Sequence, residues 1–282
     1  MKVVLFCGGS GIRLQEFSDT IPKPLVPVGN RPIIWHVMKY YAHFGHKDFV
    51  LCLGYKGDEI KNYFMKYKEY LSNDFMLRGG STIDLFERDI QEWNITFAET
   101  GIYSNVAERL LAVRKYLEGE ETFLVNYTDA LTDLYLPDMI DAFDKSGKIA
   151  MLMVTKPKKN LRVTSIEPSL PKGASRVTSV NKLDAVWLNA GYYVFRKEIF
   201  RHIDPTGDLA EYTFPRLVAL NQLMAYPYDG MFIGMDTFKE KQSLDDMYDR
   251  GDTPWQVWKN PLGVPQEAGR ANTLDELSPS IR

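Results

Sequence analysis

The sequence contains few of the residues that bind zinc or carry redox chemistry. Its 282 residues include 2 cysteines and 4 histidines. Cys7 and Cys52 each lie inside an apolar run, and neither has a cysteine or histidine nearby at the spacing of a zinc site. We therefore expect two buried free thiols in a reducing compartment and no structural zinc.

The chain also lacks a long apolar run and an excess of charge of one sign. The apolar stretch at residues 3–7 is too short for the core of a signal peptide or for a membrane span. With 34 basic and 37 acidic residues the net charge is −3, and the basic residues are scattered along the chain. These features predict a cytoplasmic protein that binds neither membranes nor nucleic acid.

The remaining composition is that of a globular protein. Apolar residues make up 45% of the chain and charged residues 25%, and the length allows one large α/β domain or two small ones. Short apolar runs alternate with amphipathic stretches, which predicts βαβ units and a mostly parallel sheet. We expect strands at residues 2–7, 48–53, 122–127, 148–155, 176–182 and 190–196, and helices at 32–44, 57–70, 105–118, 137–146, 211–221 and 237–250.

Two segments interrupt this alternation. Residues 71–98 contain Gly79 and Gly80 between β-capable stretches, which predicts a hairpin-like excursion. Residues 259–282 are rich in proline, glycine and polar residues. They are expected to form either a flexible tail or an arm that lies across a neighbouring subunit.

The first strand runs directly into glycines, in the order Gly8-Gly9-Ser10-Gly11-Ile12-Arg13. Glycines allow the backbone to approach a phosphate, and successive N–H groups in such a turn bind anions. Farther on, Lys23 stands between Pro22 and Pro24, which hold the backbone extended and limit where the amine points. The pattern is neither a dinucleotide fingerprint nor a Walker A loop. On its own it is also compatible with a tight βα turn and an incidental arginine.

This start, continued by Pro22-Lys23-Pro24-Leu25-Val26-Pro27, resembles the sugar-phosphate nucleotidyltransferases. Within that family it is most similar to the glucose-1-phosphate cytidylyltransferases. The resemblance covers roughly residues 1–258 and includes Trp93-Asn94-Ile95-Thr96, Met235-Asp236-Thr237 and Pro254-Trp255.

The resemblance implies a single nucleotidyltransferase domain over residues 1–258, folded as a three-layer α/β sandwich. Its sheet would be mixed but mostly parallel and Rossmann-like, as in nucleotide-diphospho-sugar transferases. The implied reaction is an in-line displacement in which a sugar 1-phosphate attacks the α-phosphorus of a nucleoside triphosphate and pyrophosphate leaves. CTP and glucose 1-phosphate are the favoured substrates, Mg²⁺ is the implied cofactor, and a homo-oligomer is expected.

The resemblance also assigns roles to individual residues. Arg13, Lys23 and Asp129 match the catalytic positions, and Asp129 and Asp236 match the two carboxylates that hold Mg²⁺. Both aspartates follow apolar runs, where strands of open α/β sheets end and ligands bind; a helix cap or a turn is the alternative for each. The implied nucleotide-binding positions are Leu5, Phe6, Cys7, Gly8, Gly9, Gly11, Ile12, Arg13, Lys23, Ser104, Arg109 and Thr128.

The acceptor side of the implied site matches the family less well. Asn189 and Gly191 correspond to an Asn-Gly-Gly segment near the sugar. Lys182 is a weaker candidate for the sugar phosphate, because Asn181-Lys182-Leu183 replaces the Glu-Lys-Pro of the family. The early histidines, His36, His43 and His46, are interpreted as surface or packing residues.

Alanine stands at three positions, Ala107, Ala130 and Ala190, where relatives usually have glycine. These methyl groups are either drift at tolerant sites or a reshaping of the sugar pocket. The second interpretation allows a different sugar, a non-sugar phosphate or phosphonate, or a weakly active nucleotide-binding regulatory relative.

Overall fold

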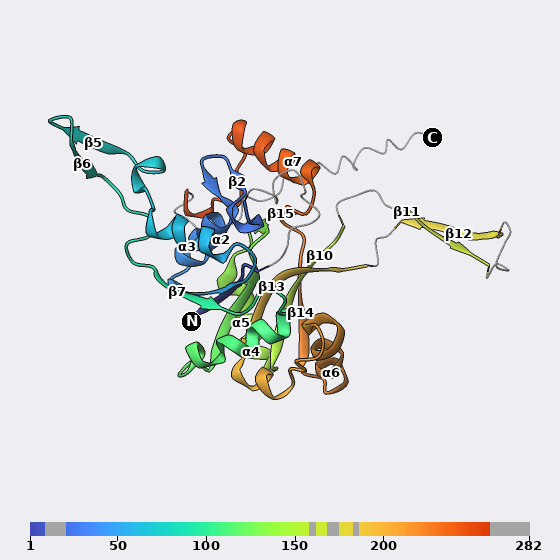
Figure 1. Cartoon of the computed structure of the whole chain (residues 1–282). Helices are drawn as coiled ribbons and strands as arrows, with labels where there is room; N and C mark the ends of the chain where they lie inside the picture. The colour runs from blue at the N-terminus through green and yellow to red at the C-terminus, as the bar shows by residue number, and fades with distance from the viewer. Residues whose placement is uncertain (9–20, 158–161, 168–174, 183–185, 260–282) are drawn as a thin grey trace, which may run out of the picture.

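The computed structural model describes residues 1–8, 21–157, 162–167, 175–182 and 186–259. Within them, a seven-stranded sheet forms the centre of the molecule (Figure 1). Its strands, in spatial order, are β14 (Leu223–Tyr228), β10 (Ala150–Thr155), β13 (Leu188–Arg196), β8 (Thr122–Tyr127), β1 (Val3–Phe6), β4 (Asp48–Leu53) and β7 (Asn94–Glu99).

Strand β13 is antiparallel to both of its neighbours, and the other neighbouring pairs of this sheet are parallel. The sheet is therefore mixed but mostly parallel, as the sequence predicts. Strand β14 was not among the predicted strands. It lies at the edge of the sheet, where Pro227 is tolerated and where most side chains are only half-buried or exposed, so its apolar signal is weak.

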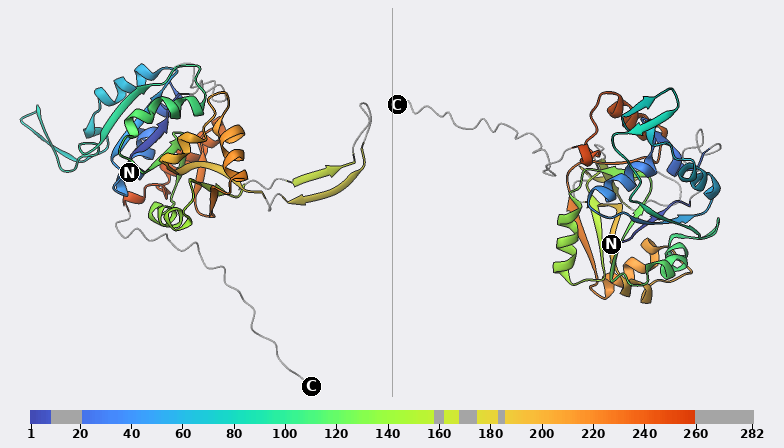
Figure 2. Two further views of the ribbon diagram at one scale, coloured as in Figure 1. Left: turned by 90° about the horizontal axis from the view of Figure 1, so that it is seen from below. Right: turned by 90° about the vertical axis from the view of Figure 1, so that its left-hand side faces the viewer.

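Helices cover both faces of the sheet, which gives the expected three-layer sandwich (Figures 1 and 2). Alternate side chains of β1 enter different cores: Val3 and Leu5 pack on one face, Val4 and Phe6 on the other. The core that contains Leu5 includes α2 (Ile33–His43), α3 (Gly57–Met65), α5 (Leu136–Ser146) and α7 (Phe238–Asp249); the core that contains Val4 includes α4 (Val106–Val113) and α6 (Phe214–Ala219).

Two predicted helices are shorter than expected, and a third is irregular. The helix predicted at 57–70 ends at Met65, and the one at 105–118 changes to a 3-10 turn after Val113. The third begins with a π-helical turn, Leu209–Thr213, directly before α6. Pro215 has no N–H for a regular helical bond at this point, so the turn widens there.

Two antiparallel ribbons project from the body on different sides (Figures 1 and 2). One is formed by β5 (Phe75–Arg78) and β6 (Thr82–Leu85), within the predicted excursion. The other is formed by β11 (Arg162–Ile166) and β12 (Val177–Lys182). Two smaller pairs complete the strands, β2 (Pro27–Val28) with β3 (Arg31–Pro32) and β9 (Ala130–Thr132) with β15 (Phe232–Gly234).

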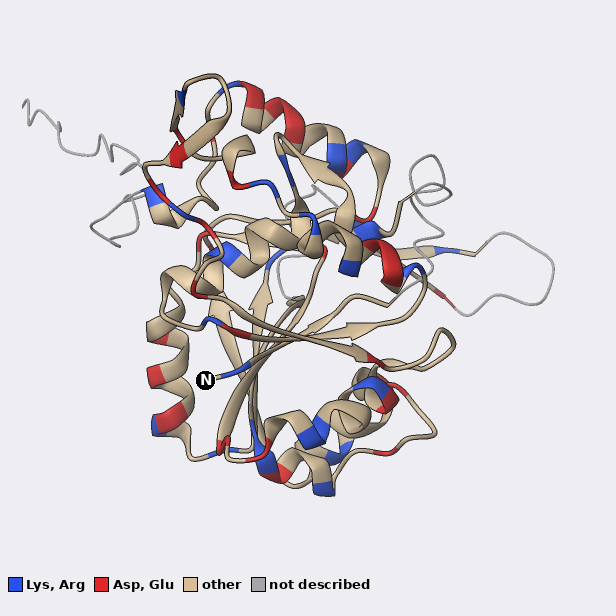
Figure 3. Ribbon diagram, turned by 60° about the vertical axis from the view of Figure 1, so that its left-hand side comes forward, with Lys and Arg blue, Asp and Glu red and all other residues tan. Residues whose placement is uncertain are grey.

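Basic and acidic residues are interspersed over the described helices and loops (Figure 3), in line with the small net charge. None of the helices in the described ranges combines the length and the apolar character that crossing a membrane requires. Of the predicted tail at residues 259–282, Lys259 ends a 3-10 turn, Val257–Lys259, and the rest lies outside the described residues.

Candidate active site

The carboxyl ends of the parallel strands bring the predicted site residues to one edge of the sheet. Phe6 of β1 pairs with Tyr127 of β8 on one side and with Cys52 of β4 on the other. Gly8 and Asp129, which follow β1 and β8, therefore lie at the same edge. In open α/β sheets this edge is where ligands bind.

The guanidinium of Arg109 packs against the glycine that follows β1. A Cβ at Gly8 would lie 2.3 Å from Nη1 of Arg109, and a Cβ at Gly54 would lie 2.8 Å from the same atom. A side chain at either position would therefore displace the guanidinium of Arg109. Gly54 was not among the predicted site residues, although its place directly after the apolar strand 48–53 is the same signal that marks Gly8.

Arg109 is buried, and its hydrogen bonds go to the chain itself. Nη1 donates to the carbonyl oxygen of Leu53 at 3.0 Å and to Thr100 Oγ1 at 2.7 Å, and Nη2 donates to the carbonyl of Ile102 at 3.4 Å. Burial lowers the pKa of this group, although the side chain still stays charged. The predicted nucleotide contact of Arg109 would therefore be made from a position already fixed between β1, β4 and the loop after β7.

The other nucleotide-binding candidates in the described residues are held by local contacts. Leu5, Phe6 and Cys7 are buried, so only the backbone end of this strand can face a ligand. Thr128 Oγ1 donates to the carbonyl of Phe6 at 3.0 Å, and Ser104 Oγ donates to the carbonyl of Thr100 at 2.5 Å. Cys7 and Cys52 are buried free thiols, as predicted.

Lys23 and the two predicted metal ligands meet in space. The Nζ atom of Lys23 lies 2.7 Å from Oδ2 of Asp129 and 2.6 Å from Oδ1 of Asp236. The lysine begins a 3-10 turn, Lys23–Leu25, directly after the extended Pro22, and only 16% of its side chain is exposed. Pro22 is extended as the sequence predicts, but Lys23 itself lies in a turn and not in the extended backbone expected between the two prolines.

A short antiparallel ribbon sets the two aspartates side by side. Ala130 of β9 pairs with Gly234 of β15, and the backbone N–H of Met235 donates to the carbonyl of Asp129 at 2.7 Å. Asp129 precedes β9, and Asp236 follows β15 by two residues. The ribbon joins positions more than 100 residues apart, which no local sequence signal reveals.

The two carboxylates, Asp129 and Asp236, favour the cationic form of Lys23 between them. Burial of Lys23 lowers the pKa of its ammonium group, but Asp129 and Asp236 together outweigh burial and raise the pKa above its ordinary value. Within the described ranges, no three histidine, cysteine or acidic side chains cluster closely enough to hold a metal. Two carboxylates with hard oxygen atoms suit Mg²⁺, which takes one or two protein carboxylates and completes its coordination with phosphates and water.

Two of the predicted acceptor residues, Asn189 and Gly191, lie on β13 next to the end of β8, and the third, Lys182, does not. Asn189 Oδ1 accepts a hydrogen bond from the N–H of Gly191 at 3.0 Å, and its Nδ2 donates to the hydroxyl of Tyr193 at 2.8 Å. Gly191 has a φ of +75°, and a Cβ there would lie 2.8 Å from the ring of Tyr127. Lys182 ends β12, in the projecting ribbon.

The three alanines that depart from the family pattern belong to the core. Ala107 is fully buried, and Ala130 and Ala190 are each 4% exposed. Ala107 packs in the core on the α4 face, and the other two pack in the core on the α2 face. None of the three has a positive φ. Their methyl groups therefore fill the interior and do not occupy a left-handed turn.

Four predicted residues of the glycine-rich start, Gly9, Gly11, Ile12 and Arg13, lie outside the described residues. Of the early histidines, His36 is buried and His43 is exposed, which agrees with packing and surface roles.

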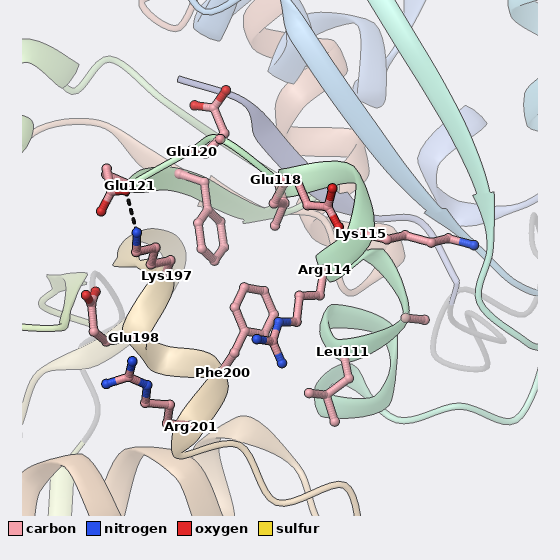
Figure 4. Close-up of a pocket in the computed structure, with 14 residues that line it drawn as sticks. Leu111, Arg114, Lys115, Glu118, Glu120, Glu121, Lys197, Glu198, Phe200 and Arg201 are labelled. Carbon is pink, nitrogen blue, oxygen red and sulfur yellow. Dashed lines mark hydrogen bonds and ion pairs between the residues drawn. The ribbon is translucent and has the colours of Figure 1, made fainter.

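A cavity of about 630 Å³ lies at the opposite, amino end of the parallel strands, next to Phe123 at the start of β8 (Figure 4). Lys197 pairs with Glu121 there, and the guanidinium of Arg114 lies over the ring of Phe200 at 5.5 Å. The lining carries four basic side chains (Arg114, Lys115, Lys197 and Arg201) and four acidic ones (Glu118, Glu120, Glu121 and Glu198). This balance and the location separate the cavity from the predicted site.

A three-layer sandwich with a glycine turn, a lysine and two aspartates at the carboxyl edge of its sheet is the arrangement of an α/β enzyme that binds phosphorylated ligands. Comparison with known families agrees. The model of the nucleotidyl transferase family matches residues 2–213. The chain therefore belongs to the nucleotidyl transferase family.

Curated relatives resemble nearly the whole chain. A glucose-1-phosphate cytidylyltransferase of Salmonella typhi is 34% identical over 265 residues, which cover 92% of this chain and 100% of the relative. A probable glucose-1-phosphate cytidylyltransferase of Bacillus subtilis (strain 168) is 32% identical over 260 residues with the same coverage. The resemblance inferred from the motifs is thereby confirmed.

Solved structures share the fold at lower identity. An apo UDP-glucose pyrophosphorylase superposes with a TM-score of 0.63 at 16% identity, covering 89% of this chain and 99% of the other. HddC from Yersinia pseudotuberculosis, complexed with GMP-PN, superposes with a TM-score of 0.63 at 18% identity, covering 88% and 99%. These matches confirm the predicted fold class.

Proposed function

We propose that this protein transfers a cytidylyl group from CTP to glucose 1-phosphate and releases pyrophosphate. The observation that carries the proposal is the convergence of Lys23, Asp129 and Asp236 at the carboxyl edge of the sheet. The choice of CTP and glucose 1-phosphate rests on the names of the relatives, which match the chain over 92% of its length.

In the proposed reaction, the protein positions two anionic substrates and neutralises their charge. The raised pKa of Lys23 keeps its ammonium protonated, so it would donate hydrogen bonds to nonbridging phosphate oxygens near the scissile bond. The backbone at Gly8 would approach the nucleotide, and the guanidinium of Arg109 packs against that backbone. An oxygen of the sugar phosphate then forms a bond to the α-phosphorus as the bond to pyrophosphate breaks.

Asp129 and Asp236 would hold Mg²⁺ in this proposal. When bound, the ion would supply positive charge that stabilises the negative charge of the phosphates. The two carboxylates meet this requirement because both contact one ammonium group and so face a common point. Lys23 balances them in the structure described here, which keeps two like charges close together without strong repulsion.

Two further parts of the proposal concern the acceptor and the assembly. Asn189 and Gly191 would line the sugar side, because they begin β13 beside the end of β8.

We also propose a homo-oligomer. The ribbon β5–β6 supports this, because Phe75, Met76 and Leu77 are each at least 40% exposed on it.

The test is to measure pyrophosphate release with Mg²⁺, each of CTP, UTP, dTTP and GTP, and a panel of sugar 1-phosphates. Release with CTP and glucose 1-phosphate above all other pairs is expected. Preferential release with another pair would show that the proposed base or the proposed acceptor is wrong. No release with any pair would refute nucleotidyl transfer.

Variants link the activity to the proposed metal site. Asp129→Asn and Asp236→Asn should each lower turnover by at least a hundredfold, because each removes a metal ligand without a change of shape. Asp141→Asn is the matched control, since Asp141 is an exposed partner of Lys145 on α5. Near-normal turnover in either of the first two variants would contradict the metal assignment.

A further inference from the structure

The position of Asp129 depends on the two peptide groups that flank Ala130. The first accepts a hydrogen bond through the carbonyl of Asp129 from the N–H of Met235 at 2.7 Å. The second accepts one through the carbonyl of Ala130 from the hydroxyl of Tyr192 at 2.8 Å. One bond comes from the ribbon that carries Asp236, and the other comes from β13.

Tyr192 is itself firmly placed. Its side chain is 2% exposed, its ring stacks on that of Tyr41, and it meets the ring of Tyr40 edge-on. It directly follows Gly191, whose positive φ and close approach to Tyr127 fix the start of β13. A rigid phenol therefore connects the strand that begins at the proposed acceptor residues with the loop that carries Asp129.

We infer that Tyr192 is a positioning residue: its hydroxyl holds the Ala130 carbonyl and thereby sets the carboxylate of Asp129 for divalent-metal binding opposite Asp236. The inference rests on the proposed function of these two aspartates. Residues that orient a metal ligand through hydrogen bonds commonly affect metal affinity or activity 10- to 100-fold when they are replaced.

The hydroxyl is available as a donor. Burial raises the pKa of Tyr192 well above its ordinary value, so the phenol stays protonated at neutral pH. Tyr192→Phe removes this single donor and leaves the ring packing in place. The Ala130 carbonyl, which is buried with its residue, then loses the hydroxyl from which it accepts a hydrogen bond.

The chain provides a matched control. Tyr40 is also 2% exposed and also donates through its hydroxyl to a backbone carbonyl, that of Leu134, at 2.8 Å. Leu134 lies beyond β9 and does not adjoin either aspartate. Tyr40→Phe therefore removes an equivalent buried hydrogen bond without changing the loop that carries Asp129.

The experiment measures divalent-metal binding and turnover in the full-length wild-type protein and in both variants. Mn²⁺ binding is followed by the EPR signal of the free ion in the presence of α,β-methylene CTP, which cannot release pyrophosphate. We expect Tyr192→Phe to weaken Mn²⁺ binding about tenfold and to raise by a similar factor the Mg²⁺ concentration that gives half-maximal rate. Tyr40→Phe should change both by less than twofold, while the two variants lose similar amounts of Tm.

Two outcomes would overturn the positioning role. One is unchanged Mn²⁺ affinity and Mg²⁺ dependence in Tyr192→Phe, and the other is an equal change in Tyr40→Phe, which would mean a general loss of rigidity. Failure of the proposed function looks different, because the wild-type protein itself would then neither release pyrophosphate nor bind Mn²⁺ with the CTP analogue.

Discussion

Replacement of Asp89 by asparagine should destabilise the protein through a buried charge cluster at the root of the β5–β6 excursion. Asp89 Oδ2 accepts hydrogen bonds from the hydroxyls of Tyr67, at 2.8 Å, and Ser72. Arg31 Nη2 lies 3.6 Å from the same oxygen, and Lys39 Nζ lies 3.3 Å from Oδ1. The cluster thus ties α2 to both ends of the excursion.

The magnitude follows from the burial of both charges. The side chains of Arg31 and Asp89 are 2% and 4% exposed. Burial opposes the charge of Asp89, but the hydrogen bonds from Ser72 and Tyr67 and the charge of Lys39 outweigh it and lower the pKa of the carboxyl. Removal of one partner of a buried ion pair costs about 3–5 kcal/mol. We expect about 3 kcal/mol, because Lys39 is partly exposed and can find water.

Urea unfolding followed by tryptophan fluorescence gives the change in free energy, and limited proteolysis shows where the structure loosens. Cleavage should concentrate in residues 66–92, since Arg31 also bonds the carbonyl of Lys68 and the hydroxyl of Ser72. Glu92→Gln is the control, because Glu92 pairs with Lys47 at the surface, and its unfolding midpoint should match the wild type. A loss below about 1 kcal/mol in Asp89→Asn would refute the reasoning.

Two other predictions concern the site and the pH dependence of stability. Lys23→Ala should lower kcat by about 10²–10³, equivalent to about 2.7–4 kcal/mol of transition-state stabilisation, with an unchanged circular dichroism spectrum; a loss of less than threefold would argue against its role. Burial lowers the pKa of His36 from 6.5 to about 4, so the folded state binds a proton less readily than the unfolded state. The contribution of neutral His36 to the free energy of unfolding should therefore be fully present above about pH 6.5. The free energy of unfolding should fall by about 3 kcal/mol as the pH drops towards 4. His36→Gln should reduce this fall in urea unfolding curves, and an unchanged pH dependence would exclude His36 as a cause.

Much of the fold follows from local patterns. The strands β1, β4 and β8 are mostly apolar because both of their faces are buried. Elements that lack such a pattern could not be predicted. Strand β14 is an edge strand with mostly half-buried or exposed side chains, and β9 and β15 are three-residue strands whose pairing depends on the rest of the fold.

The candidate site also has a part that the sequence predicts and a part that it does not. A glycine after a strand and a lysine between prolines can be recognised in the sequence, because each constrains its own backbone. The contact of Lys23 with Asp129 and Asp236 could not be predicted from the sequence, since it arises from a turn and a ribbon that lie far apart in the chain. Arg109 could be assigned to the nucleotide side only by resemblance; its fixed place between Gly8 and Gly54 depends on three strands.

The structure also changes where the acceptor preference is to be sought. If Ala130 and Ala190 lined an open pocket, their methyl groups would reduce the space for a sugar. Both are instead packed in the core, and Ala190 lies next to a glycine that keeps the positive φ of the turn. Lys182, which also departs from the family pattern, lies at the end of a ribbon strand and outside the central sheet. The three alanines should accordingly matter mainly for stability, and we propose that the acceptor preference depends on the Asn189 turn.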